Sequence, residues 1–338
     1  MYKKIFIALL ILGLPCSAHA ISENDYAGQY QAKVLPFYDN GSFSQFTGSG
    51  DVLLRYAAFE RDNETGALVI LHGKSESYIK YAEVVYDLQE LGLSCYLMDA
   101  RGFGFSERIL QDDPQKVYVD HFDDYVEDLK IFIDTVVKAK PHSRIFILSH
   151  SLGGCIAARY LEKYPDNITA AVLSSPMVQI DTGSFPPAVA YGIAAISTAL
   201  GKGTDYAIGQ GPRELKPNFY NNTTTHSFAR WSKWEEDLIP SNPEIASGGA
   251  TYGWIKNSME AGALSRRKAG AIETPLLLLQ AEEDWFVRSE GQDMLCDRAD
   301  DCSKVYCYGS RHEILMETDP IRDVAMENIK SFLRKFID

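Results

Sequence analysis

Residues 147–154 of the chain read Ile-Leu-Ser-His-Ser-Leu-Gly-Gly. An apolar, strand-like run ends within this stretch, the chain has to turn sharply, and a helical pattern begins at Ser151. Such a turn strains the serine backbone and exposes its hydroxyl, so the residues two positions away on either side must be small. Gly153 meets this requirement, and so does Ser149, although the usual pattern, G-x-S-x-G, has glycine there. The stretch therefore predicts that Ser151 is a nucleophile held between a strand and a helix.

Segments typical of strands and of helices alternate on both sides of this turn. Short apolar runs predict strands at residues 67–71, 93–98, 144–148, 168–174, 275–280 and 304–308. Helical spacing predicts helices at residues 81–91, 122–136, 151–163, 289–296 and 320–336. This alternation predicts an α/β fold with a mostly parallel central sheet and helices on both of its faces. Residues 43–60 are expected to add antiparallel strands at one edge of the sheet.

The alternation breaks between residues 178 and about 268, where no clear strand is found. We interpret this segment as a helical lid inserted into a single domain that spans residues 21–338. An apolar stretch within it, residues 185–200, has two interpretations. It forms an acyl-chain wall or a surface that touches a membrane, or it is a helix packed on the core.

A serine hydroxyl becomes a strong nucleophile only when a base takes its proton. When the nucleophile sits on a turn of this kind, the acid follows a late strand and the histidine follows the last strand. Asp284 and His312 occupy these positions. We therefore predict a catalytic triad in which His312 acts as general base and then general acid, while Asp284 orients the imidazole of His312 next to Ser151. Glu282 and Glu283 are alternatives for the acid.

The tetrahedral intermediate of such a reaction needs hydrogen-bond donors for its oxyanion. One predicted donor is the backbone N–H of Leu152, at the start of the helix that follows the nucleophile. The other is the backbone N–H of Lys74, directly after His72 and Gly73 at the end of a strand. The side chain of Lys74 either pairs with a substrate phosphate or is simply solvated.

No metal site and no dinucleotide-binding fingerprint is predicted. The stretch Gly102-Phe103-Gly104 is not continued into a phosphate-binding loop. The predicted chemistry therefore uses no cofactor.

Six cysteines are present, and five of them lie beyond residue 20. Cys95 and Cys155 are expected to be buried thiols. Cys302 and Cys307 flank an extended run that would separate them by about 16 Å, too far for a disulfide. Cys296 is therefore expected to pair with one of these two, and we favour Cys302 over Cys307. A zinc site is the competing interpretation, but no histidine stands at a usual zinc spacing.

The first 20 residues have the layout of a secretory signal peptide. Lys3 and Lys4 precede the apolar run 5–14, and Ala18-His19-Ala20 is a typical cleavage pattern. We expect cleavage after Ala20 and export to the periplasm or beyond the cell. The alternative is an uncleaved segment that anchors the protein in the membrane.

The 338-residue chain carries a formal net charge of −13. A field of this sign repels nucleic acid, so no nucleic-acid partner is expected. It also repels anionic membrane surfaces, so any peripheral membrane contact must be made by apolar surface or by a local basic patch.

Several stretches together resemble the monoacylglycerol-lipase-like α/β-hydrolases and, among them, bacterial lysophospholipases. They are the turn at 147–154, His72-Gly73, and residues 76–83, 99–106, 205–209, 225–227, 248–252 and 309–313. The resemblance implies the α/β-hydrolase fold. It also implies hydrolysis of the acyl ester of a lysophospholipid through an acyl-enzyme, with Ser151, Asp284 and His312 at the family's triad positions.

Other activities remain open at this point. A monoacylglycerol lipase or a general carboxylesterase would need the same three residues. A serine aminopeptidase of the same fold would also need lid carboxylates for a substrate amine, and Glu235, Glu236 and Asp237 are candidates that otherwise form a solvated face. A binding protein without catalysis is disfavoured, because binding alone does not require an intact triad.

Overall fold

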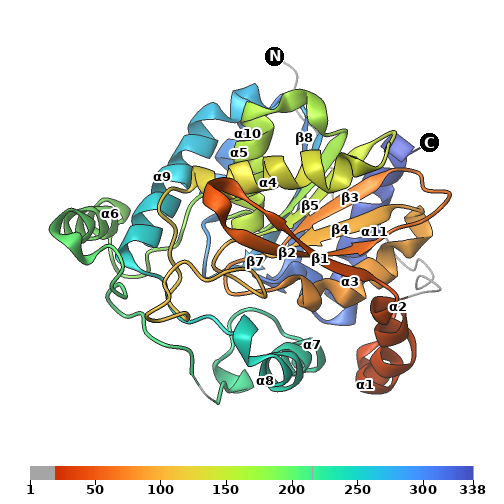
Figure 1. The fold of residues 1–338 in the computed structure, drawn as a ribbon, viewed down its shortest axis with the longest axis horizontal. Coiled ribbons are helices and arrows are strands. Elements are labelled where there is room, and N and C mark those ends of the chain that lie inside the picture. Colours follow the sequence, from red (N-terminus) through yellow and green to blue (C-terminus); the bar gives the residue numbers. More distant parts are fainter. Residues whose placement is uncertain (1–19, 215, 338) are drawn as a thin grey trace.

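The computed structural model describes residues 20–214 and 216–337. Within them, one eight-stranded sheet runs through the molecule in the order β1-β2-β4-β3-β5-β6-β7-β8 (Figure 1). The strands are β1 (Ser42–Thr47), β2 (Leu53–Phe59), β3 (Ala67–Leu71), β4 (Ser94–Met98), β5 (Ile145–His150), β6 (Ala170–Ser174), β7 (Leu276–Glu283) and β8 (Cys302–Arg311). From β4 to β8 neighbouring strands are parallel, whereas β1 and β2 add an antiparallel edge. The mostly parallel sheet and its antiparallel edge are thus confirmed.

Helices cover both faces of the sheet, because strands β3 to β6 are buried on both sides and their apolar residues need cover on each. One face packs against α4 (Asp123–Thr135), α5 (Leu152–Lys163) and α10 (Ser289–Arg298). The other face packs against α3 (Ala82–Asp87) and the long C-terminal helix α11 (Asp319–Ile337). Figure 1 shows these two layers on either side of the strands.

The N-terminal segment contains helices that the sequence analysis did not predict. Helix α1 (Tyr26–Gln29) and helix α2 (Leu35–Asp39) are joined by a π-helical turn. Tyr26, Tyr30 and Val34 on this segment are buried against the face that α3 and α11 cover. The predicted signal peptide, by contrast, lies outside the described residues except for its last position.

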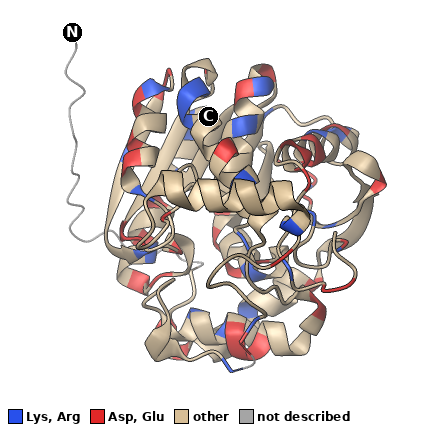
Figure 2. Ribbon diagram, turned by 90° about the vertical axis from the view of Figure 1, so that its left-hand side faces the viewer, with Lys and Arg blue, Asp and Glu red and all other residues tan. Residues whose placement is uncertain are grey.

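Residues 175–275, between β6 and β7, form what we call the insertion. Its helices are α6 (Pro187–Ser197), α7 (Phe228–Ser232), α8 (Ile239–Ser241) and α9 (Tyr252–Lys268), and its described part contains no named strand. Helix α9 packs against α5, and α6 packs against α9 at the periphery of the molecule (Figure 1). No residue of α6 is charged, and the helix is tan throughout in Figure 2. In residues 20–214 and 216–337, no helix combines the length and hydropathy needed to cross a bilayer.

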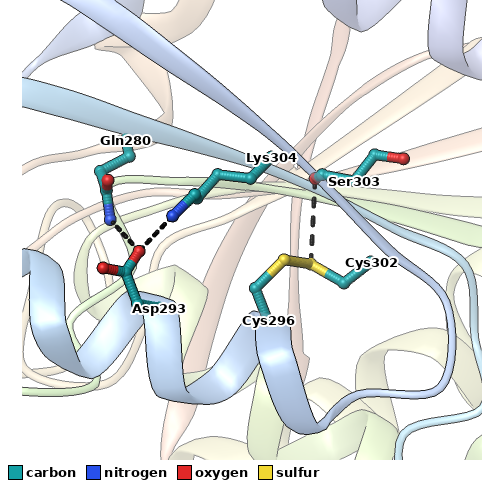
Figure 3. Close-up of a disulfide and its surroundings, with 6 residues drawn as sticks. All are labelled: Gln280, Asp293, Cys296, Cys302, Ser303 and Lys304. Carbon is teal, nitrogen blue, oxygen red and sulfur yellow. Dashed lines mark hydrogen bonds and ion pairs between the residues drawn. A yellow bond between two sulfur atoms is a disulfide. The ribbon is translucent and has the colours of Figure 1, made fainter. Parts of the chain in front are cut away.

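A disulfide joins α10 to the start of β8. It links Cys296 to Cys302, whose Cα atoms are 5.3 Å apart (Figure 3). This is the pairing that the sequence analysis favoured. The carboxylate of Asp293 on α10 also pairs with Lys304 of β8 and accepts a hydrogen bond from Gln280 of β7. The three remaining described cysteines are buried free thiols: Cys95, Cys155 and Cys307.

Candidate active site

Ser151 lies at the turn between β5 and α5 with a positive φ of 49°. A non-glycine residue held there costs about 1–3 kcal/mol, which the surrounding packing has to offset. The close packing also explains Gly153, because a Cβ on this residue would lie 2.5 Å from the carbonyl oxygen of Leu71. Ser149 is buried, and its hydroxyl donates to the carbonyl of Val172 at 3.1 Å. The structure thus accommodates a serine where the usual pattern has glycine.

An unbroken hydrogen-bonded chain connects Ser151 to His312 and Asp284. The Nε2 of His312 is 2.9 Å from the Oγ of Ser151, and its Nδ1 is 2.7 Å from the Oδ2 of Asp284. The three side chains come from the carboxyl ends of β5, β8 and β7 respectively. The parallel sheet places these strand ends along one edge, which brings together residues that are far apart in the sequence.

Asp284 is the one of three consecutive carboxylates that contacts the histidine. Its Oδ1 accepts the backbone N–H groups of Phe286 and Val287, at 2.9 and 3.0 Å. Glu282 instead accepts the backbone N–H of Gly309, and Glu283 lies 3.3 Å from the Nε2 of His226. Neither glutamate is hydrogen-bonded to His312 in the described structure.

Electrostatics favour an ionised Asp284 beside a basic His312. Burial alone would raise the pKa of Asp284, but the charge of His312, their hydrogen bond and the two backbone N–H groups lower that pKa below its usual value. Burial alone would lower the pKa of His312, yet the charge of Asp284, their hydrogen bond and the more distant Glu313 and Glu76 raise it. The imidazole is therefore a better proton acceptor than a free histidine.

Two backbone N–H groups near Ser151 are available to an oxyanion. Leu152 is the first residue of α5, so its N–H has no acceptor within its own helix. In residues 20–214 and 216–337, the N–H of Lys74 has no protein acceptor either, whereas that of Gly73 donates to the Oε2 of Glu76 at 2.7 Å. The sequence analysis selected the same two groups, and their role as oxyanion donors stays a prediction.

The side chain of Lys74 makes a hydrogen bond to the hydroxyl of Ser75 at 3.1 Å. It forms no ion pair with a carboxylate of the described part of the chain. Burial, followed by the charge of Arg213, lowers the pKa of this ammonium group to about 8. Within the described residues, Lys74 is thus a cation without a carboxylate partner, and it directly follows Gly73 in the loop after β3.

Two residues in the stretches quoted above, His72 and Asp99, have structural roles. The Nε2 of His72 accepts the backbone N–H of Ala100 at 3.0 Å. Asp99 is buried and accepts hydrogen bonds from the Ser77 hydroxyl and from the backbone N–H groups of Tyr78 and Phe105. These bonds tie the loops after β3 and β4 together. No sequence signal distinguishes such a buried aspartate from a catalytic one.

The arrangement can carry out acyl transfer by a nucleophile, a base and an acid. In the part of the chain that the structure describes, no group of three or more histidine, cysteine or acidic side chains is placed to hold a metal ion.

Comparison with known proteins places the chain among hydrolases. The family model described as serine aminopeptidase, S33 (Hydrolase_4) matches residues 62–319. Lysophospholipase L2 of Escherichia coli K12 is 35% identical over 321 residues, covering 93% of each chain. A probable lysophospholipase L2 of Haemophilus influenzae is 30% identical, covering 89% of this chain and 95% of the relative.

A solved structure shows the same fold at lower identity. It is that of a soluble variant of monoglyceride lipase from Saccharomyces cerevisiae, with a TM-score of 0.70 and 19% identity, covering 88% of this chain and 95% of the other. The sheet order, the Ser151 turn and the family match agree. The chain belongs to the serine aminopeptidase S33 (Hydrolase_4) family and has the α/β-hydrolase fold.

Proposed function

We propose that the protein is a serine ester hydrolase that removes the acyl chain of lysophospholipids. The observation that carries this proposal is the hydrogen-bonded chain from Ser151 through His312 to Asp284, with distances of 2.9 and 2.7 Å. These are hydrogen-bond distances suitable for proton transfer from the serine to the imidazole.

In the first half of the proposed reaction, the Oγ of Ser151 attacks the ester carbonyl carbon while its proton passes to the Nε2 of His312. The carbonyl oxygen becomes an oxyanion that accepts the N–H groups of Leu152 and Lys74. The C–O bond to the glycerol then breaks, and the leaving oxygen takes the proton from His312. Ser151 is left acylated.

In the second half, water attacks the acyl carbon and gives a proton to His312. The tetrahedral intermediate collapses, the Ser151 oxygen recovers that proton, and a free fatty acid leaves. Asp284 keeps the imidazole in the orientation and tautomer that both halves need, and it stabilises the imidazolium that forms in each half.

The substrate class rests on the relatives and on one local feature. The relatives at 35% and 30% identity are named lysophospholipases, and the match covers about nine-tenths of each chain. Lys74, which pairs with no carboxylate of residues 20–214 or 216–337, follows directly after Gly73 and suits a substrate that carries a phosphate. A monoacylglycerol has the same scissile ester but no phosphate, and it is the alternative substrate.

The family description names an aminopeptidase, which would need a free carboxylate for the substrate amine. The three insertion carboxylates that could serve already have partners. Glu235 is paired with Arg213, Glu236 accepts the Ser232 hydroxyl, and Asp237 is paired with Lys233. These pairings favour the ester substrate over the peptide. They also correct the expectation that all three form a solvated face, because Glu235 is only partly exposed.

Export is the second part of the proposal. If the leader is removed after Ala20, the mature chain begins at Ile21, which is buried. Ser22 and the backbone N–H of Glu23 both bond to Asp319, at 2.8 and 2.9 Å, so the residues just after the expected cleavage site are held by the fold. A disulfide between Cys296 and Cys302 also suits an oxidising compartment.

We further propose that the uncharged helix α6 and the turn after it contact lipid. Ile196 and Leu200 are 64% and 72% exposed, and Val189 is also exposed. A soluble surface normally carries few such side chains close together, and an acidic protein needs an apolar surface to approach lipid aggregates.

The test is fatty-acid release by purified residues 21–338 from a palmitoyl lysophospholipid and from monopalmitoylglycerol, with Ser151→Ala beside the wild type. A short-chain activated ester and an aminoacyl anilide complete the panel. Release from the lysophospholipid by the wild type alone supports Ser151 as the nucleophile and the lysophospholipid as the substrate. Turnover of the activated ester without release from lysophospholipid would keep the triad and reject the substrate. Cleavage of the anilide alone would support the peptidase.

A further inference from the structure

A buried ion network adjoins the His312 end of the proposed triad. Glu76 is buried on the loop that carries Lys74, and both of its carboxylate oxygens accept hydrogen bonds. Its Oε2 accepts the N–H of Gly73 and the hydroxyl of Tyr81, both at 2.7 Å. Its Oε1 accepts the Nζ of Lys80, also at 2.7 Å. Glu76 therefore fixes the peptide that immediately precedes one of the two proposed oxyanion donors.

Lys80 connects this loop to the loop that carries His312. Its Nζ is 2.8 Å from the Oε1 of Glu313, the residue that follows His312. The same ammonium lies 5.3 Å from the centre of the Trp234 ring, which belongs to the insertion. One buried cation thus contacts the oxyanion loop, the histidine loop and the insertion.

His150 completes the surroundings of His312. The two imidazole rings are 4.8 Å apart, and the Nε2 of His150 is 3.8 Å from the Oε1 of Glu76. Burial is the main reason that the pKa of His150 is lowered to about 3, so this ring stays neutral at neutral pH. The carboxylates that act on His312 are therefore Asp284, Glu313 and Glu76, and the neutral His150 ring packs against it. Lys80 is paired with two of these carboxylates, Glu76 and Glu313.

We propose that Lys80 is a positioning residue, which through Glu76 and Glu313 holds the oxyanion loop in register with His312. This inference rests on the proposed function, since it assumes that Ser151 and the Lys74 N–H act on the ester. The bridge matters because an oxyanion donor has to lie within a narrow range of the developing charge. A loop that shifts by about 1 Å loses up to roughly 100-fold in rate without losing the substrate.

The first test compares Lys80→Met with a matched control, Lys330→Met. Lys330 is also buried and also bridges two carboxylates, Glu90 and Glu327, but it lies on α11 away from the triad. Both variants lose a buried cation, so both should be less resistant to urea. Only Lys80→Met should show a kcat on the short-chain activated ester that is roughly 10-fold to 100-fold lower, with KM nearly unchanged.

A second variant keeps the fold and changes the charge. Glu313→Gln retains an acceptor for Lys80 but removes one of the negative charges near His312. The acid limb of the kcat/KM profile should then move to lower pH, because the imidazole loses a carboxylate that favours its protonated form. The kcat of this variant should stay close to that of the wild type, because Lys80 keeps an acceptor on the histidine loop.

The outcomes distinguish failure of the positioning role of Lys80 from failure of the proposed function. A folded Lys80→Met variant with wild-type kcat would overturn the inference. If that variant does not fold, Glu313→Ala takes its place, because it removes the acceptor that Lys80 uses on the histidine loop: a folded Glu313→Ala variant with wild-type kcat would then overturn the inference. Ser151→Ala is run in the same panel: if it remains as active as the wild type, the proposed function fails and this inference fails with it. If Ser151→Ala is inactive and Lys80→Met is normal, only the inference fails.

Discussion

Ser151 and His312 are 161 positions apart in the chain, yet the Oγ of the serine and the Nε2 of the histidine are 2.9 Å apart. Strands β5 and β8, which lead to these residues, are separated in the sheet by β6 and β7, or about 14 Å at ordinary strand spacing. His312 directly follows β8, so the end of this strand and the His312 side chain have to reach across that separation to Ser151. Asp284, at the end of the intervening strand β7, holds the imidazole at its destination.

The identity of the acid can be tested by three single substitutions. Asp284→Asn should lower kcat/KM for the activated ester by roughly 10⁴-fold, because an amide favours the wrong imidazole tautomer. Glu282→Gln and Glu283→Gln should leave kcat/KM close to the wild type, since neither carboxylate touches His312. Steady-state kinetics on the three purified variants show which carboxylate is the acid of the triad. A large loss in either glutamine variant, with Asp284→Asn active, would reassign the acid.

The pH profile should reflect the raised pKa of His312. The base must be neutral to accept a proton, and its pKa in the folded protein lies above the usual value of about 6.5. The acid limb of kcat/KM should therefore lie above pH 6.5, and Asp284→Asn should move the limb of any residual activity downward. Folding is linked to the same shift: the stabilisation from His312 is complete below its unfolded pKa and is lost as pH rises through the folded pKa. An acid limb well below pH 6 would contradict this assignment.

The Cys296–Cys302 disulfide should contribute stability without affecting catalysis. Its cysteines are separated by six positions, and closing so short a loop in the unfolded chain is worth about 2 kcal/mol. Cys296→Ser/Cys302→Ser should therefore unfold at lower urea concentration, and reductant should shift the wild-type midpoint but not that of the variant. Activity at low temperature should persist in both. Cys307→Ser serves as the matched control, because this buried thiol is free.

If α6 contacts the membrane, removing its apolar surface should weaken binding to lipid vesicles and leave hydrolysis of a soluble ester unchanged. Ile196→Glu/Leu200→Glu should bind vesicles at least about 10-fold more weakly, because each apolar side chain transferred out of water is worth about 1.5–3 kcal/mol. Hydrolysis of the soluble short-chain ester should not change. Val324→Glu, at a 50% exposed position on α11, is the matched control. Equal vesicle binding by the wild type and both variants would mean that α6 is not the contact.

Local patterns in the sequence predict most of the strands and helices of the fold. The predicted strand at residues 67–71 coincides with β3, and the helix predicted at 151–163 differs from α5 by one residue. Such segments are recognisable because burial imposes a periodicity on each strand and helix by itself. Helices α1 and α2 were missed because they are only four and five residues long, too short to show a helical period.

Some features of the candidate site could also be predicted from the sequence, and others could not. A small residue on each side of Ser151 and the order serine, acid, histidine are properties of the linear sequence, because a strained turn and a strand order leave local marks. The choice of Asp284 among three adjacent carboxylates is not, since neighbouring side chains at a strand end point in different directions and the register between β7 and β8 shifts beside them. The bridge from Glu76 through Lys80 to Glu313 joins residues more than 230 positions apart. Only the tertiary structure could reveal it, because an ion pair depends on distance in space and leaves no periodic trace in the sequence.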